Sequence, residues 1–88
     1  MIDNTNPTVK DVTPLSDYRL RLLFSNNEVR EFDVKPYLAK GIFKELCDNE
    51  YFNQVSVSFG AVRWPNDQDF SHDTLYILGE PISSRNAE

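Results

Sequence analysis

The strongest constraint on the fold is the segment YRLRLLFSNNEVREFDV, residues 18–34. Its first arm alternates apolar side chains with arginines, which is the two-residue period of a strand with one buried face. A second alternating arm follows two asparagines, which adopt positive φ angles more readily than most residues. A two-residue turn at Asn26–Asn27 fits, so the segment predicts a β-hairpin. One face should carry Leu20, Leu22, Phe24, Arg30, Phe32 and Val34, and the other Arg19, Arg21, Glu31 and Asp33.

The segments before and after this hairpin carry weaker signals, which predict one further strand and two short helices. The β-branched run TVKDVTPL, residues 8–15, predicts a strand that ends near Pro14. Apolar residues at helical spacing from Ile42 onward predict a short amphipathic helix of about two turns. A second short helix is expected from a cap at Asp69 or Ser71 to about Leu78. The predicted fold is α+β: an antiparallel sheet of about four to five strands, a short central helix and a short C-terminal helix.

The stretch VSVSFGAVRW, residues 55–64, changes parity in its middle. Val55 and Val57 are odd, whereas Val62 and Trp64 are even, and one regular strand cannot place all four on one face. Either Phe59–Gly60 is a tight turn between two strands, or Gly60 marks a bulge. We favour the turn.

The expected core combines the matched strand faces with the apolar stripe of the central helix. Cys47 is interpreted as a small core residue rather than a reactive thiol, and Trp64 as a core residue whose indole N–H needs a partner. Most of the core should consist of Leu20, Leu22, Phe24, Phe32, Val34, Phe43, Leu46, Val55 and Val57.

Composition narrows the class of protein. With 88 residues we expect a single domain over 1–88, ordered from about 8 to 80, with flexible ends at 1–7 and 83–88. The formal charge is −5, from nine basic and fourteen acidic residues, which opposes direct binding to nucleic acid or to an anionic membrane. A single cysteine provides no disulfide. The sequence shows neither a signal peptide nor an apolar run long enough to span a membrane, so we expect a cytoplasmic protein.

The order of motifs resembles a small bacterial family, domain of unknown function family 2442. The resemblance rests on LRLLFSNNEVREFDVKPYL, GIFKELCDNEYFNQVSV and VRWPNDQDFSHDTLY, and it covers nearly the whole chain outside its two ends. Two departures stand where the family has glycine, at Asn27 and at Asp67, and both keep turn-forming residues. The matching positions are Leu20, Leu22, Phe24, Phe32, Asp33, Val34, Phe43, Leu46, Asp48, Phe52, Val55, Trp64, Asp67, Asp69, Asp73, Leu75 and Tyr76.

The resemblance implies an α+β fold and no particular activity. Some relatives look like domains fused to a helix-turn-helix, and others are encoded beside a second small domain, an arrangement that looks like a toxin–antitoxin pair. The resemblance therefore favours a role in interactions.

Trp64, Asp67, Asp69 and Asp73 form the candidate site, around the single histidine, His72. Carboxylates suit Ca²⁺ or Mg²⁺, but the run lacks the central glycine of a calcium loop, and zinc needs more nitrogen or sulfur ligands than one histidine and a distant cysteine supply. Ser71 beside His72 does not make a nucleophile–base pair, because neighbours at a helix start diverge. We expect no catalytic, cofactor-binding or metal-binding residues. The simpler interpretation is a strand, a turn and a capped helix with a solvated His72.

Two classes of function remain. The first is a non-catalytic protein-interaction or regulatory module, acting with a partner encoded alongside or with an identical chain as a homodimer, through a sheet edge or the surface near Trp64. The alternative is a small-ligand-binding or enzymatic domain that uses Trp64 and the loop carrying Asp67, Asp69 and Asp73. Convergence of the three carboxylates in space distinguishes the two.

Overall fold

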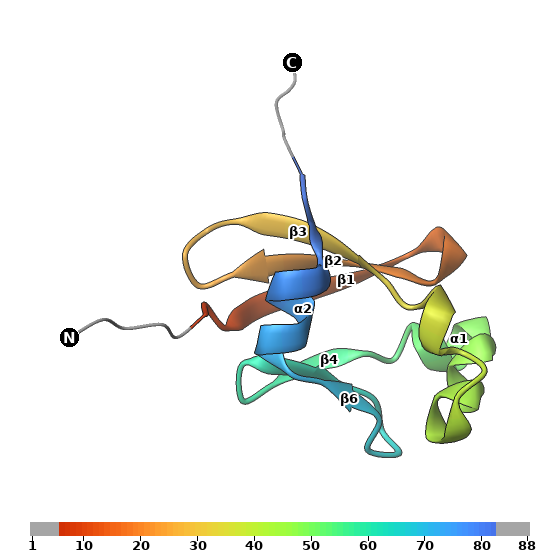
Figure 1. Ribbon diagram of the computed structural model, residues 1–88. Helices are drawn as coiled ribbons and strands as arrows, with labels where there is room; N and C mark the ends of the chain where they lie inside the picture. The colour runs from red at the N-terminus through yellow and green to blue at the C-terminus, as the bar shows by residue number, and fades with distance from the viewer. Residues whose placement is uncertain (1–5, 83–88) are drawn as a thin grey trace.

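The computed structural model describes residues 6–82, which form two antiparallel sheets with short helices beside them (Figure 1). This confirms the α+β class, with more strands than the four to five expected because several contain only two or three residues. The first sheet has the order β1-β2-β3-β7, and comprises β1 (Val9–Leu15), β2 (Arg19–Phe24), β3 (Val29–Asp33) and β7 (Glu80–Pro81). The second has the order β4-β5-β6, with β4 (Ser56–Ser58), β5 (Ala61–Arg63) and β6 (Asp69–Phe70). The flexibility expected for 1–7 and 83–88 concerns, apart from Asn6 and Pro7, residues outside the described part.

The predicted hairpin is β2–β3, but its turn has three residues rather than two. Leu20 lies opposite Phe32 and Leu22 opposite Arg30, so even-numbered residues face even-numbered residues. That register requires an odd number of loop residues. Asn27, at φ 71°, closes the loop, and its N–H donates to the Phe24 carbonyl over 2.8 Å. The predicted faces are therefore right, and the two-residue turn is wrong.

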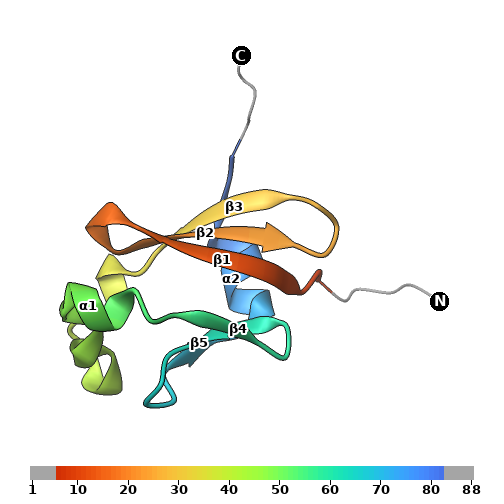
Figure 2. The same ribbon diagram turned by 180° about the vertical axis from the view of Figure 1, so that it is seen from behind.

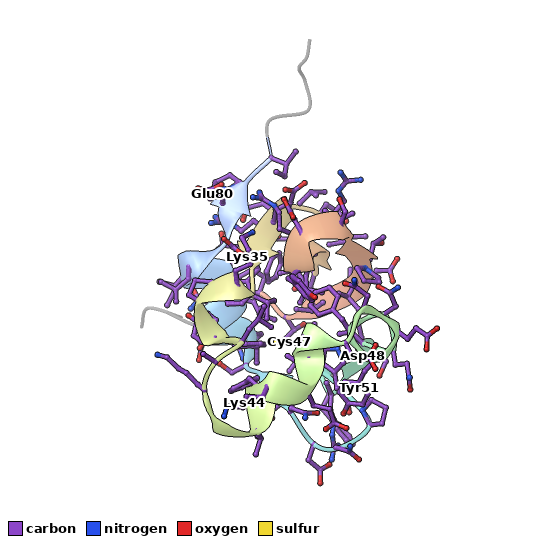
Figure 3. All side chains as sticks on the ribbon, turned by 90° about the vertical axis from the view of Figure 1, so that its right-hand side faces the viewer. Lys35, Lys44, Cys47, Asp48, Tyr51 and Glu80 are labelled. Atoms are coloured by element: carbon purple, nitrogen blue, oxygen red, sulfur yellow. The ribbon has the colours of Figure 1, made fainter. Side chains whose placement is uncertain are left out.

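The central helix differs from the prediction. Residues Gly41–Cys47 form a 3₁₀ helix, η3, and a separate one-turn α-helix, α1 (Asn49–Phe52), follows it. Asp48 separates the two because its extended backbone breaks the helix while its side chain accepts the Glu50 N–H over 3.0 Å. A shorter 3₁₀ turn, η2 (Lys35–Tyr37), follows β3. The turn η1 (Ser16–Tyr18) follows β1, and positive φ angles at Asp17 and Tyr18 make it irregular. Figure 3 looks onto this end of the molecule and labels Lys44, Cys47 and Tyr51 there.

The C-terminal helix, α2 (His72–Leu78), agrees with the prediction. Ser71 is its cap, since its hydroxyl accepts the Thr74 N–H over 3.2 Å. Asp73 lies in the first turn, where its negative charge suits the helix dipole. Phe59 and Gly60, at φ 51° and 78°, form a tight turn between β4 and β5, which confirms the favoured alternative over a bulge.

The core lies between the two sheets and α2, and aromatic rings supply much of it. Six of the nine predicted members are buried, whereas Phe43, Val55 and Val57 are only partly buried. Cys47 is exposed, so its interpretation as a core residue is wrong: it ends η3 on the outer side. The buried apolar residues are Val9, Leu20, Leu22, Phe24, Phe32, Val34, Leu46, Phe52, Val62, Trp64, Phe70 and Leu75. Within residues 6–82, no helix is long and apolar enough to cross a membrane.

Candidate functional site

Trp64 lies in the core and not on the surface. Its exposed fraction is 1%, and its indole N–H donates to the Phe52 carbonyl over 2.9 Å. The rings of Phe52 and Phe70 lie 5.9 and 6.0 Å away, between ring centroids. Trp64 therefore has the core role that its residue type predicted, and its side chain cannot contribute to the candidate interaction surface.

Gln68 holds the loop after Trp64 in place, and sequence reasoning missed it. Only 1% of the residue is exposed, which is unusual for glutamine. Its amide nitrogen donates to the Ile42 carbonyl over 2.9 Å and to a Glu45 carboxylate oxygen over 3.0 Å, while its oxygen accepts the Tyr51 hydroxyl over 2.6 Å. This satisfied network attaches the loop to η3 and α1. No local pattern marks such a residue, because its partners come from distant segments.

The three carboxylates of the candidate site do not converge. Asp67, at φ 74°, accepts a hydrogen bond from Arg63 over 2.5 Å, and Asp69 lies opposite Arg63 in the β5–β6 pair. Asp73 instead accepts from the Asn6 amide over 2.9 Å, at the start of α2. The hydrogen bond to Asp67 raises the pKa of Arg63, with smaller contributions from the charges of Asp67 and Asp69. Among residues 6–82 no group of three His, Cys, Asp or Glu side chains could hold a metal ion.

His72 is partly buried rather than fully solvated. Its Nδ1 lies 3.2 Å from the Pro7 carbonyl and 3.7 Å from a carboxylate oxygen of Asp73. The neighbouring Ser71 hydroxyl serves as the helix cap and bonds the Thr74 hydroxyl over 3.1 Å. The histidine therefore links α2 to the segment before β1, and Ser71 is not directed to it.

A hollow occurs on a different surface, where the outer face of β2 and β3 meets the end of α2. It is open to solvent, and the space within it, including part of that solvent, is about 330 Å³. Four of its five lining residues are charged, and the fifth is apolar: Arg19, Glu31, Asp33, Glu80 and Leu78. The sequence placed the first three on the exposed hairpin face, but gave no sign that Leu78 and Glu80 join them.

Ion pairs hold the charged side chains that line this hollow in place. Glu31 lies 2.7 Å from Arg19 and 3.5 Å from Arg21, and its hydrogen bond raises the pKa of Arg19. Burial raises the pKa of Asp33, but hydrogen bonds from the backbone N–H and the ammonium group of Lys35 lower it more, and the net pKa is below its usual value. Within the described chain Glu80 makes no ion pair, although its charge makes a small contribution to the raised pKa of Arg19.

Arg30 fixes the position of α2 beside the hollow. One of its terminal nitrogens donates to the carbonyls of Tyr76 and Gly79, over 3.0 and 3.2 Å, at the C-terminal end of the helix. The guanidinium also lies 3.9 Å from the centre of the Tyr76 ring. A cation at this helix end is favourable, because the last carbonyls are otherwise unpaired. The arrangement leaves Ile77 and Leu78 on the outside, with 65% and 58% of each residue exposed.

The β1 edge of the first sheet is poorly suited to pairing with another strand. β1 is one of the two edge strands of this sheet (Figure 2). Its register with β2 shifts between Val9 and Asp11. The N–H of Val12 already donates to the Asp11 side chain over 2.9 Å, and Pro14 has no N–H to offer. A bulge, a capped donor and a proline are features that discourage edge-to-edge association. Strand addition at β1, one form of the contact that we expected, is therefore disfavoured.

Comparison with known proteins identifies one family and one similar structure. The family model described as "Protein of unknown function (DUF2442)" matches residues 9–80. A crystal structure from Nitrosomonas europaea ATCC 19718, described as that of a "Putative DNA Binding Protein", is similar with a TM-score of 0.75 and 32% sequence identity. The match covers 89% of this chain but 52% of the other, so the chain spans about half of that protein. No curated protein matches the chain.

Proposed function

The chain belongs to the DUF2442 family of proteins of unknown function, and on that premise we propose that it is a non-catalytic protein-interaction module. Its contact surface is the hollow between β2, β3 and α2, together with Ile77 and Leu78. We further propose that the domain acts in the cytoplasm and that its partner is encoded alongside it, as in a toxin–antitoxin pair.

One observation carries this proposal: two adjacent large apolar residues are exposed next to a hollow with charged walls. Single exposed apolar residues are common on soluble proteins. Ile77 and Leu78 differ because Leu78 itself lines the hollow, beside Glu31, which is ion-paired, and Glu80, which has no ion-pair partner among the described residues. An apolar centre with a polar rim is the usual composition of a protein–protein contact.

The charges of the hollow indicate what kind of partner fits. Glu31 and Asp33 form ion pairs with neighbouring cations, whereas Glu80 forms none within residues 6–82. A partner that places an apolar side chain against Leu78 and a lysine or arginine near Glu80 would complement both features. We expect the charged contact to set the rate and specificity of association, and the apolar contact to supply most of its free energy.

The alternative function, small-ligand binding or catalysis at Trp64, Asp67, Asp69 and Asp73, receives less support. Trp64 is buried, and the carboxylates lie in two separate groups. Direct DNA binding is not proposed either. The name of the similar Nitrosomonas protein concerns a longer chain, of which the match covers 52%, and this chain has a formal charge of −5. Contacts with phosphates require clustered cations.

The proposal is tested with the product of the neighbouring gene, purified separately and titrated into the domain by calorimetry. The variant Ile77→Ser/Leu78→Ser should weaken a saturable interaction about tenfold or more, because it removes the apolar centre of the contact. Ile42→Ser is the matched control: Ile42 is 62% exposed but lies on η3, away from the hollow. Equal affinity for the parent and the double variant would contradict the proposed surface.

If the neighbouring product does not bind, the same three proteins are immobilised and exposed to a cell lysate. We expect a protein retained by the parent and by Ile42→Ser but not by the double variant, and its complex should form again from purified components. Identical retention profiles for all three proteins would count against an interaction through this surface.

A further inference from the structure

The strongest remaining feature is the tip of the β4–β5 hairpin. Among residues 6–82, five residues other than glycine have positive φ angles: Asp17, Tyr18, Asn27, Phe59 and Asp67. Asparagine and aspartate tolerate this conformation best, and they account for three of the five. Bulky residues adopt it at a cost of roughly 1–3 kcal/mol, which the surrounding structure has to offset. Tyr18 and Phe59 therefore require an explanation.

For Tyr18 the surrounding contacts supply the explanation. Its hydroxyl donates to the Cys47 carbonyl over 2.5 Å, and its ring packs edge-on against Phe52 with the ring centroids 5.4 Å apart. Its own carbonyl accepts the Val34 N–H over 2.9 Å. These contacts attach the β1–β2 turn to α1 and to the end of β3.

For Phe59 no such contacts exist, because the residue is 100% exposed. The turn is held by its neighbour instead: the Gly60 carbonyl accepts the Val9 N–H over 2.8 Å. A Cβ at Gly60 would lie 2.8 Å from the Cβ of Thr8, so this position needs glycine. At position 59, asparagine or glycine would meet the backbone requirement of the turn better than phenylalanine does. The aromatic ring is therefore not needed for the fold.

The two chain segments that form and adjoin this turn carry no charge. Residues 53–62 contain no charged side chain, although 26% of the chain is charged. The segment packed against the turn, Pro7 to Val9, is also uncharged. Figure 2 shows this turn beside the start of β1. Depletion of charge around an exposed aromatic residue is characteristic of the centre of a protein interface.

We propose that Phe59 anchors a symmetric contact between two copies of this chain. In such a contact the same patch meets itself, so it has to be compatible with itself in charge. Two chains of charge −5 repel one another, and this repulsion is weakest where the facing surfaces carry no charge. Two phenylalanine rings can also pack edge-on or offset against each other, which favours association beyond the burial of their area. This surface is separate from the hollow at α2, so the inference goes beyond the proposed function.

The test is sedimentation velocity of the purified chain from about 10 µM to about 1 mM, the range in which a small interface gives a weak dimer. Reductant is present so that the exposed Cys47 cannot cross-link chains. We expect reversible dimerisation, weakened about tenfold or more by both Phe59→Ser and Phe59→Asn. Ile42→Ser, which also removes an exposed apolar side chain, should leave the dissociation constant unchanged.

Circular dichroism confirms that each variant is folded before it is compared. A monomer at every concentration would overturn the proposal, and so would a dimer that both Phe59 variants leave intact. A dimer lost in Ile42→Ser but kept in Phe59→Ser would place the contact on η3 and also overturn it.

Discussion

The β1–β2 turn and the β4–β5 turn each contain an aromatic residue in the left-handed conformation, and they differ in what that residue contacts. Tyr18 is tied to Cys47 and Phe52, whereas Phe59 is fully exposed. The same backbone conformation therefore occurs for different reasons in the two turns. In the first turn the fold requires the side chain, and in the second the fold requires only the backbone. An unfavourable conformation that no contact within the fold offsets indicates a residue used for something other than folding.

The largest expected loss in the free energy of unfolding comes from a substitution in the core, and the effects at the two turns can be compared with it. Leu22 is fully buried on β2, opposite Arg30 and Val12 on the adjacent strands. Leu22→Ala should lower the free energy of unfolding by about 2–5 kcal/mol, measured by chemical denaturation. A variant indistinguishable from the parent would mean that the face assignment of β2 is wrong.

Tyr18→Ala should have the next largest effect, because it removes the contacts of the β1–β2 turn without removing its strain. We expect a loss of about 2 kcal/mol in the same measurement, from the ring packing and one hydrogen bond. Tyr18→Phe keeps the ring and should lose about 1 kcal/mol. If both variants are as stable as the parent, the contacts with Cys47 and Phe52 do not offset the strain, and the contrast with Phe59 disappears.

The β2–β3 turn, whose left-handed residue is Asn27, allows a smaller effect to be measured through pH. A hydrogen bond from Tyr76 lowers the pKa of Glu28, the residue after this turn, below its usual value of 4.5, and Asn26 and Arg30 lower it further. Because the folded-state pKa is depressed, the stabilisation is present above about pH 4.5 and is lost as the pH falls through the lower folded-state value.

Glu28→Gln should therefore be less stable than the parent at neutral pH, and its stability should change less between neutral pH and about pH 3. Chemical denaturation across that range measures the difference. Parallel pH profiles for the two proteins would show that the hydrogen bond from Tyr76 contributes nothing.

The fold was most predictable where its signals are local. The alternation from Tyr18 to Val34 is visible in the chain itself, and so are the cap at Ser71 and the turn at Phe59–Gly60. The three-residue loop ending at Asn27 was also within reach, because even-numbered residues can face even-numbered residues only across an odd loop. The two asparagines favour the shorter turn because both tolerate positive φ angles, but only Asn27 adopts one here.

The features that the sequence did not predict depend on contacts between residues far apart in the chain. Gln68 is buried only because Ile42, Glu45 and Tyr51 reach it from the segment that precedes β4. Asp48 divides the central helix through a local cap, but the 3₁₀ geometry before it has no separate signal. The candidate site was selected from clustering along the sequence, and folding separated its carboxylates. Only part of the hollow could be predicted. Arg19, Glu31 and Asp33 belong to the predicted hairpin, whereas Leu78 and Glu80 come from the other end of the chain.

The central claim is that three of the exposed apolar residues, Phe59, Ile77 and Leu78, serve contacts with other molecules and not the folding of the domain itself. The most direct test is the free energy of unfolding of Phe59→Asn and Tyr18→Asn, measured by chemical denaturation at low protein concentration. Asparagine relieves the backbone strain equally at both positions. We expect Phe59→Asn to be more stable than the parent by about 1 kcal/mol and Tyr18→Asn to be less stable. A loss of stability in Phe59→Asn would contradict the claim, because the Phe59 ring would then contribute to the fold.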